Sequence, residues 1–302
     1  MSAPTARVVA VALAVSGTAL TAQQPTFRAG VEIVRLDVSV TRGGEPVTGL
    51  TVADFEVRDN GKRQQLIGLL REEVPLDVFF VFDTSGSVRG GKREDLRRAA
   101  HAFLSRLVPG DQAALVTFSH QVSLLQSLTP DLGLVGRAVD ALEPGGSTAL
   151  NDGLYAALLQ RTPNERRAVV VIFSDGLENI SWLTVDTVVE AAKRSDIVVY
   201  GVTLLAQAGP TRVSVRQPET FPPPLEDELL RRVALATGGR VWAADSSGRL
   251  EEMFTDVLRE IRSRYLLAYE PEPAGQAGWH RVQVKVKRDK GVVTSRPGYY
   301  AK

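Results

Sequence analysis

Four almost wholly apolar runs constrain what this chain of 302 residues can fold into more than any other feature of its sequence. A strand that is apolar on both faces must be covered on both, which is typical of a parallel sheet between two layers of helices. The runs lie at residues 76–82, 113–118, 168–173 and 197–202. Helical patterns separate them, so the sequence predicts an α/β fold built on a doubly wound, mostly parallel sheet.

The segments between and after the runs have the spacing of helices that pack one face on a sheet. In residues 92–107, apolar side chains recur every three or four positions, while the arginines fall largely elsewhere. Residues 122–128 follow the second run too closely for a crossover helix, so we expect an antiparallel edge strand there. The proline-containing stretch 206–224 is expected to be a surface loop. Further helices are predicted at residues 132–142, 151–159, 185–194, 226–236 and 250–264.

The segments on either side of this body follow the two-residue period of half-exposed strands. The alternation is visible at residues 34–40 and 282–286, and Asn60-Gly61 predicts a hairpin turn between short strands at 55–57 and 64–67. We expect these flanking segments to pair with each other; two separate additions to the sheet edges are the alternative. The predicted organisation is an amino-terminal β segment at 30–73, an α/β domain at 75–264 and a carboxy-terminal β segment at 265–302.

The first 22 residues have the pattern of a signal peptide. Arg7 precedes an apolar stretch at residues 8–20, and the small residues Thr21 and Ala22 follow it. The stretch is too short to span a bilayer comfortably, so we expect cleavage after Ala22, with an uncleaved anchor as the alternative. No later segment could cross a membrane by its composition. A secreted or periplasmic protein without a membrane span in its mature chain is therefore predicted.

Charge and cysteine content exclude several classes of function. The net charge is only +1, so no overall field favours nucleic acid or an anionic membrane, and partners must be recognised locally. The chain contains no cysteine, which removes disulfides, thiolate nucleophiles and zinc–thiolate sites.

Hydroxyl and carboxylate side chains gather where the predicted strands end. Asp83, Ser85 and Ser87 follow the first run, Thr148 closes a Gly-Gly-Ser-Thr stretch before a helix, and Asp175 follows the third run. Ligands of open α/β sheets collect at the carboxyl ends of the strands, so this is a candidate site. Each loop alone could be a helix cap, since Asp, Ser and Thr commonly cap helices.

The set Asp83, Ser85, Ser87, Thr148 and Asp175 resembles the metal-ion-dependent adhesion site of von Willebrand factor type A domains at every position. The resemblance covers residues 75–264. The flanking β segments, with an ending at Pro297-Gly298-Tyr299-Tyr300, are similar to those of bacterial secreted proteins called VWFA-related. The resemblance implies that Ser85 and Ser87 ligate Mg²⁺, or Mn²⁺ or Ca²⁺, directly, and that Thr148 does so directly or through water. It implies that Asp83 and Asp175 act mainly through waters and that a partner protein supplies a carboxylate.

The chemistry of these residues agrees with that implication. Mg²⁺ is a hard ion that takes six oxygens, and neutral hydroxyls leave it electrophilic. Aspartates in an outer shell orient the hydroxyls and waters without neutralising the ion. Gly86, Gly145 and Gly146 would allow the loops to turn and to approach closely, although ordinary turns use glycine as well.

Other polar residues near these loops have simpler interpretations. Residues at or near the starts of helices are more typical of caps than of ligands, although two of them could contact a partner at the rim. His120 is interpreted as a hairpin residue, with an approach to the site as the alternative. The basic run at Lys92, Arg93, Arg97 and Arg98 is interpreted as a solvated helix face. The residues near helix starts are Asn151, Asp152, Glu178 and Asn179, of which the last two are the rim candidates.

Signatures of catalysis are missing from the sequence. It contains no strained nucleophile elbow, no phosphate-binding loop, and no second carboxylate two residues after Asp83, where a phosphatase would need one. We therefore expect a metal-dependent protein-binding module rather than an enzyme. A metal that only orders loops is the second hypothesis, and a metal-assisted hydrolase is the third.

Overall fold

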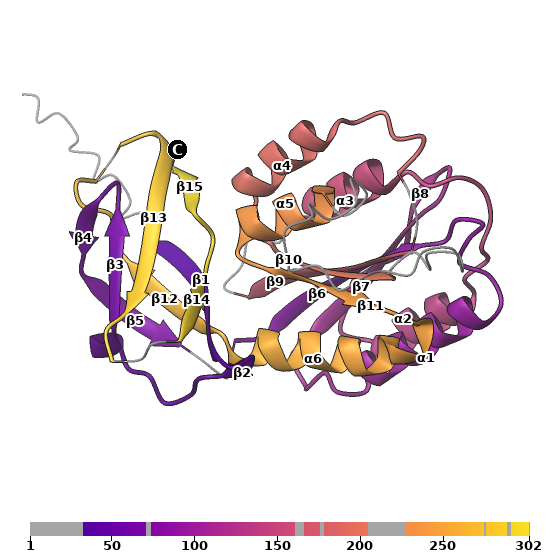
Figure 1. The fold of residues 1–302 in the computed structure, drawn as a ribbon, viewed down its shortest axis with the longest axis horizontal. Coiled ribbons are helices and arrows are strands. Elements are labelled where there is room, and N and C mark those ends of the chain that lie inside the picture. Colours follow the sequence, from indigo (N-terminus) through magenta and orange to yellow (C-terminus); the bar gives the residue numbers. More distant parts are fainter. Residues whose placement is uncertain are drawn as a thin grey trace, which may run out of the picture. The chain divides into compact units, whose positions relative to one another are not determined.

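A six-stranded sheet forms the centre of the α/β part of the computed structural model (Figure 1). The structure describes residues 33–70, 74–160, 166–175, 178–204, 228–274, 276–288 and 291–301. The predicted signal peptide and the predicted loop at 206–224 lie outside these residues. The strand order is β11-β10-β9-β6-β7-β8, and only β8 runs antiparallel to its neighbour. The strands are β6 (Leu76–Asp83), β7 (Gln112–Phe118), β8 (Val122–Thr129), β9 (Arg167–Ser174), β10 (Val198–Leu204) and β11 (Arg240–Ala244).

Helices cover both faces of this sheet because its central strands are apolar on both. In β6, Phe80 and Phe82 pack into the core on one face, whereas Phe79 and Val81 pack into the core on the other. Helices α1 (Gly91–Leu104), α2 (Leu132–Asp140) and α6 (Leu250–Ser263) cover the first face. Helices α3 (Leu150–Leu158), α4 (Val185–Arg194) and α5 (Glu228–Thr237) cover the second. The predicted doubly wound fold class is confirmed.

The central strand β6 lies at the point where the winding of the sheet reverses. Its neighbours are β7 on one side and β9 on the other, so the loops that follow β6 and β9 leave the same sheet edge in different directions. A crevice at such a switch point is where α/β proteins bind ligands.

The segments before and after the α/β part form two antiparallel sheets with a common core. One sheet has the order β14-β1-β12-β5, with β2 beside β1, and the other has the order β15-β13-β3-β4. Alternate residues of both sheets, such as Leu36, Val57 and Leu267, point into the core between them. The first sheet contains β1 (Val34–Arg42), β2 (Glu45–Pro46), β5 (Leu66–Leu70), β12 (Tyr265–Tyr269) and β14 (Val292–Thr294). The second contains β3 (Phe55–Asp59), β4 (Lys62–Gln64), β13 (Gly278–Val286) and β15 (Gly298–Ala301).

Two details of the strands differ from the prediction. The strand expected at 64–67 is divided: β4 pairs with β3 across the Asn60-Gly61 turn, and β5 pairs with β12 in the other sheet. The division allows one short segment to contribute to both sheets. The edge strand β11 was not predicted, because only its parallel pairing with β10 distinguishes it from a loop.

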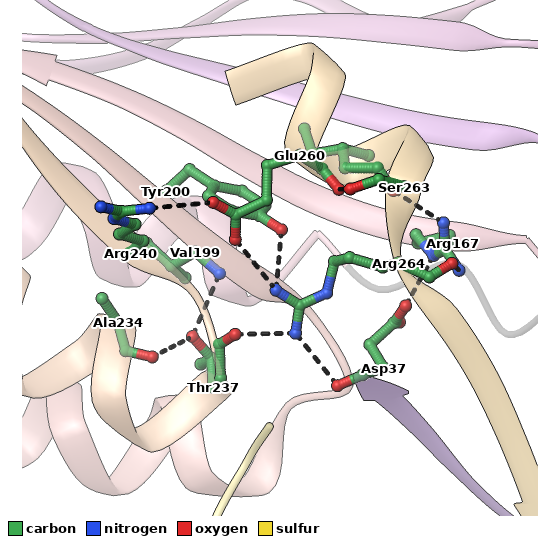
Figure 2. A network of polar contacts seen from close by, with 12 residues as sticks. Asp37, Arg167, Val199, Tyr200, Ala234, Thr237, Arg240, Glu260, Ser263 and Arg264 are labelled. Carbon is green, nitrogen blue, oxygen red and sulfur yellow. Dashed lines mark hydrogen bonds and ion pairs between the residues drawn. The ribbon is translucent and has the colours of Figure 1, made fainter. Parts of the chain in front are cut away.

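Arg264 joins the two parts of the molecule where α6 ends and β12 begins (Figure 2). Its side chain is fully buried and donates to the carbonyl oxygens of Asp37 in β1 and Gly238, at 3.0 and 2.7 Å. It also donates to the hydroxyl of Tyr200 at 3.1 Å and pairs with the carboxylate of Glu260. These bonds use Nη1 and Nη2 of the buried guanidinium, whereas Nε has no hydrogen-bond partner among the described residues. The bond to the carbonyl of Asp37 links β1 to the α/β part.

No helix in the described ranges is long and apolar enough to span a membrane.

Candidate metal centre

Asp83 anchors the first loop of the candidate site at the carboxyl end of β6. Its side chain is completely buried, and each oxygen accepts a hydrogen bond: Oδ1 from the amide of Ser85 at 2.8 Å, and Oδ2 from the hydroxyl of Ser174 at 2.8 Å. Because Ser174 ends β9, the carboxylate bridges the ends of two neighbouring strands. Ser174 was not among the predicted site residues, although its place directly before Asp175 could have indicated it.

The surroundings of Asp83 favour a nearby cation. Burial raises the pKa of its carboxyl above the ordinary value, against the hydrogen bonds from Ser85 and Ser174, and the charge of Asp175 acts in the same direction as burial. Two carboxylates close together in a buried place repel each other. A positive charge between them would relieve that repulsion.

The second loop, between α2 and α3, is held against the first by backbone hydrogen bonds. The amide of Gly145 donates to the carbonyl of Thr84 at 2.7 Å, and the amide of Gly86 donates to the carbonyl of Gly146 at 2.9 Å. Gly146 has a φ of +80°, which a residue with a side chain rarely adopts. These bonds bring Thr148, which is buried, to the same end of the sheet as Asp83.

The third loop follows β9 and closes the arrangement. The hydroxyl of Ser87 donates to Oδ1 of Asp175 at 2.7 Å, which joins the first loop to the third. The amide of Thr148 donates to the side-chain oxygen of Asn179 at 3.0 Å, and the amide of Asn179 donates back to the carbonyl of Thr148 at 3.1 Å. All three loops are thus linked in pairs.

The donor set suits a small divalent ion. The hydroxyl oxygens of Ser85 and Ser87 lie 3.0 Å apart. Neighbouring ligands of an octahedral ion with metal–oxygen distances of about 2.0–2.1 Å are separated by about 3 Å, so both hydroxyls could bind one Mg²⁺. Among the described residues, no group of three His, Cys, Asp or Glu side chains could hold a metal. The candidate site depends instead on hydroxyl oxygens beside two carboxylates.

Lys92 differs from its predicted place on a solvated helix face. Its ammonium contacts Oδ2 of Asp175, whose side chain is fully buried, while the lysine side chain keeps 41% of its surface exposed. A lysine in the first turn of a helix opposes the helix dipole, but that position alone does not identify the partner of its ammonium.

The four residues expected near helix starts divide into two groups. Asn151 and Asp152 lie in the first turn of α3, as expected, whereas Glu178 and Asn179 lie in the loop between β9 and α4. Asp152 accepts from the amides of Trp182 and Leu183, both at 3.0 Å. These contacts order the loop beside the candidate site and leave the side chain of Trp182 95% exposed.

The carboxylate of Glu178 organises the same loop. It accepts from the amides of Asn151, Ile180 and Ser181 and from the hydroxyl of Ser181. Burial raises the pKa of this carboxyl, but the hydrogen bonds outweigh burial and bring the pKa below its ordinary value. Glu178 is therefore a charged acceptor occupied by its own loop.

The histidines have separate surroundings. His120 lies at the second loop of the candidate site, because a Cβ added to Gly146 would be 2.2 Å from its Nδ1 atom. His101 contacts Asp140 on the surface, and His280 is buried against Asp59 in the β part. His120 lies in the turn of the β7–β8 hairpin, as interpreted, and of the three histidines it is also the one that contacts the second loop of the candidate site.

Fold and site together define an α/β protein with a candidate metal centre at the switch point of a doubly wound sheet. Residues 78–178 match the family model described as the von Willebrand factor type A domain. The chain therefore carries a von Willebrand factor type A domain. The match includes all five predicted site residues, whose role as metal ligands stays a prediction.

Two solved structures have a similar fold. The fold is similar to a von Willebrand factor type A protein from Catenulispora acidiphila, with a TM-score of 0.53, 16% identity, and coverage of 80% of this chain and 71% of that one. It is also similar to a mussel byssus thread matrix protein whose adhesion-site motif is occupied by zinc, with a TM-score of 0.53, 19% identity, and coverage of 67% and 49%.

The curated relatives are bacterial. A UPF0353 protein of Mycolicibacterium gilvum is 25% identical over 203 residues, covering 61% of this chain and 60% of the relative. Another, from Mycolicibacterium vanbaalenii, is 24% identical over 225 residues, covering 68% and 64%. The chain thus spans about three fifths of the length of these relatives.

Proposed function

We propose that this protein is a metal-dependent binding module that holds a carboxylate of a partner protein outside the cytoplasm. The proposed ligands are the hydroxyls of Ser85 and Ser87, with Thr148 bound directly or through water. Asp83 and Asp175 complete the site mainly through waters. Mg²⁺ is the first candidate ion, with Mn²⁺ and Ca²⁺ as further candidates. The observation that carries the proposal is the pair of hydroxyls 3.0 Å apart beside the carboxylates of Asp83 and Asp175, whose side chains have no exposed surface.

Hydrogen bonds within the chain orient the proposed ligand hydroxyls. The backbone bond from Ser85 to Asp83 and the bond from Ser87 to Asp175 fix the direction of the two hydroxyls. A bound Mg²⁺ would offer an electrophilic position to a carboxylate oxygen, because neutral hydroxyl ligands leave much of its charge uncompensated. The exposed position of Ser87, beside the buried Ser85, leaves one side of the site open to a partner.

The hydrogen bonds between the loops favour binding over a purely structural metal. The chain joins the first and second loops through Gly86 and Gly146, and the second and third through Thr148 and Asn179. These bonds use backbone groups and the side chain of Asn179 and none of the proposed ligand oxygens, so metal binding would not have to break them. We therefore expect chelators to abolish partner binding and to leave the fold intact.

The extracellular location and the non-enzymatic role are parts of the same proposal. They rest on the signal-peptide pattern of residues 1–22 and on the absence of a nucleophile elbow or a phosphate loop in the sequence. Nucleic acid is not expected as a partner because the net charge is +1.

Substitution of Ser85 tests the proposal. Ser85→Ala removes one proposed ligand and should weaken Mg²⁺ and Mn²⁺ binding at least about a hundredfold in calorimetric titrations. It should also abolish Mg²⁺-dependent capture of protein from the secreted or periplasmic fraction. The circular dichroism spectrum should remain that of the wild type, since a single exchange of hydroxyl for hydrogen leaves the loop backbone in place.

Ser127→Ala is the matched control, because Ser127 is an exposed serine of β8 away from the three loops. It should bind metal and partner like the wild type. Capture that persists in chelator, or in Ser85→Ala, would contradict the proposal. Turnover of a substrate that depends on the same ion would favour the hydrolase hypothesis instead.

A further inference from the structure

Lys92 occupies an unusual position for a cation. It is the second residue of α1, where the unpaired backbone amides and the helix dipole both repel positive charge. Lysine at such a position usually extends into solvent. Here the side chain turns to the candidate metal centre and places its ammonium on Oδ2 of Asp175.

Asp175 needs this contact because its carboxylate has no access to solvent. The side chain is 0% exposed, and Oδ1 accepts the hydroxyl hydrogen of Ser87 at 2.7 Å. A buried carboxylate without a cationic partner is strongly destabilising. Of the ion pairs between described residues, the one with Lys92 is the one that neutralises Asp175.

We infer that Lys92 is a built-in cation that a divalent ion displaces from Asp175 when it binds to the hydroxyls of Ser85 and Ser87. This inference rests on the proposed metal site. Ser87, a proposed ligand of the ion, donates to one oxygen of Asp175, while the ammonium of Lys92 contacts the other oxygen. A divalent ion bound at Ser87 and the ammonium of Lys92 would therefore lie beside the same carboxylate. Two positive charges beside one buried carboxylate repel each other strongly.

The lysine can leave at low cost. Its side chain is 41% exposed, and a flexible four-carbon stem lets the ammonium reach water without moving the helix. Metal binding is then an exchange of one cation for another. Lys92 keeps Asp175 neutralised before the ion arrives, and it lowers the apparent affinity for the ion.

Two measurements should therefore move in opposite directions in Lys92→Met, which retains most of the stem and removes the charge. In calorimetric titrations with Mg²⁺ or Mn²⁺ alone, the dissociation constant should fall at least about tenfold, because no internal cation competes. In chelator, the thermal unfolding midpoint should fall by several degrees, because Asp175 loses its partner. If Lys92 only supported the loops, Lys92→Met would lower the stability of the fold and weaken metal binding together.

Arg93→Met is the matched control from the next position of the helix. The guanidinium of Arg93 donates to the carbonyl of Leu142 and lies near Glu143, away from Asp175. The dissociation constant of Arg93→Met for Mg²⁺ or Mn²⁺ should stay within about twofold of the wild-type value. If Lys92→Met folds poorly, Lys92→Gln replaces it, because the amide can still donate to Asp175 without a full charge.

The outcomes separate this inference from the proposed function. The exchange of Lys92 for the metal ion would be overturned if Lys92→Met bound the ion as weakly as the wild type or more weakly, or if its unfolding midpoint in chelator were unchanged. The proposed metal site would still stand in that case, provided that the wild type binds the ion. Failure of both the wild type and Lys92→Met to bind either ion would overturn the metal site, and the exchange with it.

Discussion

Gly146 is the residue on which the close approach of the second loop depends. Its φ of +80° belongs to the left-handed region, and a Cβ there would lie 2.2 Å from Nδ1 of His120. The carbonyl of the same residue accepts the amide of Gly86, so a shift of Gly146 would also move the loop that carries Ser85.

Gly146→Ala should therefore lower both stability and metal affinity. We expect a loss of about 1–3 kcal/mol in the free energy of unfolding, measured by chemical denaturation, because a side chain in this conformation is strained. Metal affinity, measured by calorimetry, should fall as the hydroxyls lose their alignment.

The neighbouring Gly145→Ala is the control. A Cβ at Gly145 meets no atom within 4 Å, and its amide would still donate to Thr84. Equal effects of the two substitutions would show that the closeness of Gly146 to His120 is unimportant.

Part of the candidate site was predictable residue by residue, and part was not. The sequence placed Asp83 and Asp175 at one edge because the carboxyl ends of parallel strands meet there, whereas Thr148 joined the set through its resemblance to the adhesion-site motif. It could not show that Lys92 bonds to Asp175, or that Asn179 bonds to Thr148. Those contacts depend on the direction of side chains on separate elements, which no local pattern records.

At the scale of elements, α3 sets the position of the second and third loops. It begins two residues after Thr148, and its first turn carries Asp152, which accepts from the amide of Trp182 in the third loop. The helix approaches β7 so closely at Gly153 that an added Cβ would be 2.7 Å from the Cβ and Cγ atoms of Phe118.

Gly153→Ala tests whether this approach is needed. Alanine in a helix is intrinsically favoured over glycine by about 1 kcal/mol. Overpacking against a buried ring costs about 1–3 kcal/mol, and Phe118 is fully buried, so the cost should prevail. We expect a net loss of stability in urea denaturation.

Gly136→Ala in α2 serves as the comparison. There the nearest atom to an added Cβ is Cε1 of His101 at 3.2 Å, on a half-exposed side chain that can move. This substitution should be neutral or stabilising. A stabilising effect at both glycines would contradict the close packing of α3 on β7.

Prediction of elements succeeded where burial alone determines the pattern. The central strands β6, β7, β9 and β10 are apolar on both faces, and this property is visible in sequence. The edge strand β11 has a single buried residue, Ala244, and is recognised only by its pairing with β10. Likewise, nothing local indicates that residues 62–70 change sheets.

At the scale of the whole molecule, Arg264 connects the β part to the α/β part. Arg167 supports the same junction: it donates to the carbonyl of Ile261 at 2.9 Å and lies 2.7 Å from the carboxylate of Asp37. Both arginines are buried, and both contact groups from segments far apart in the sequence.

Arg264→Met should destabilise the whole chain. It leaves Glu260 without its buried partner and leaves the carbonyls of Asp37 and Gly238 without their donors. Removal of one member of a buried pair costs about 3–5 kcal/mol, which denaturant unfolding can measure.

Arg259→Met on the same helix is the control. Arg259 forms an exposed pair with Asp256, and such pairs contribute less than about 1 kcal/mol. A loss of less than about 1 kcal/mol in Arg264→Met as well would mean that the junction carries little of the stability.

The pairing of β1 with β12 has a consequence for the order of events during synthesis. The amide of Leu50 donates to the hydroxyl of Tyr265, 215 residues later in the sequence. The second sheet is complete only when β13 and β15, near the carboxyl end, have been made. The six strands of the large sheet have all been made once Ala244 leaves the ribosome. The first strand of the β part, β1, has only its short pairing with β2 until β12 and then β14 emerge, so the rest of its edges stays open during synthesis of the whole α/β part.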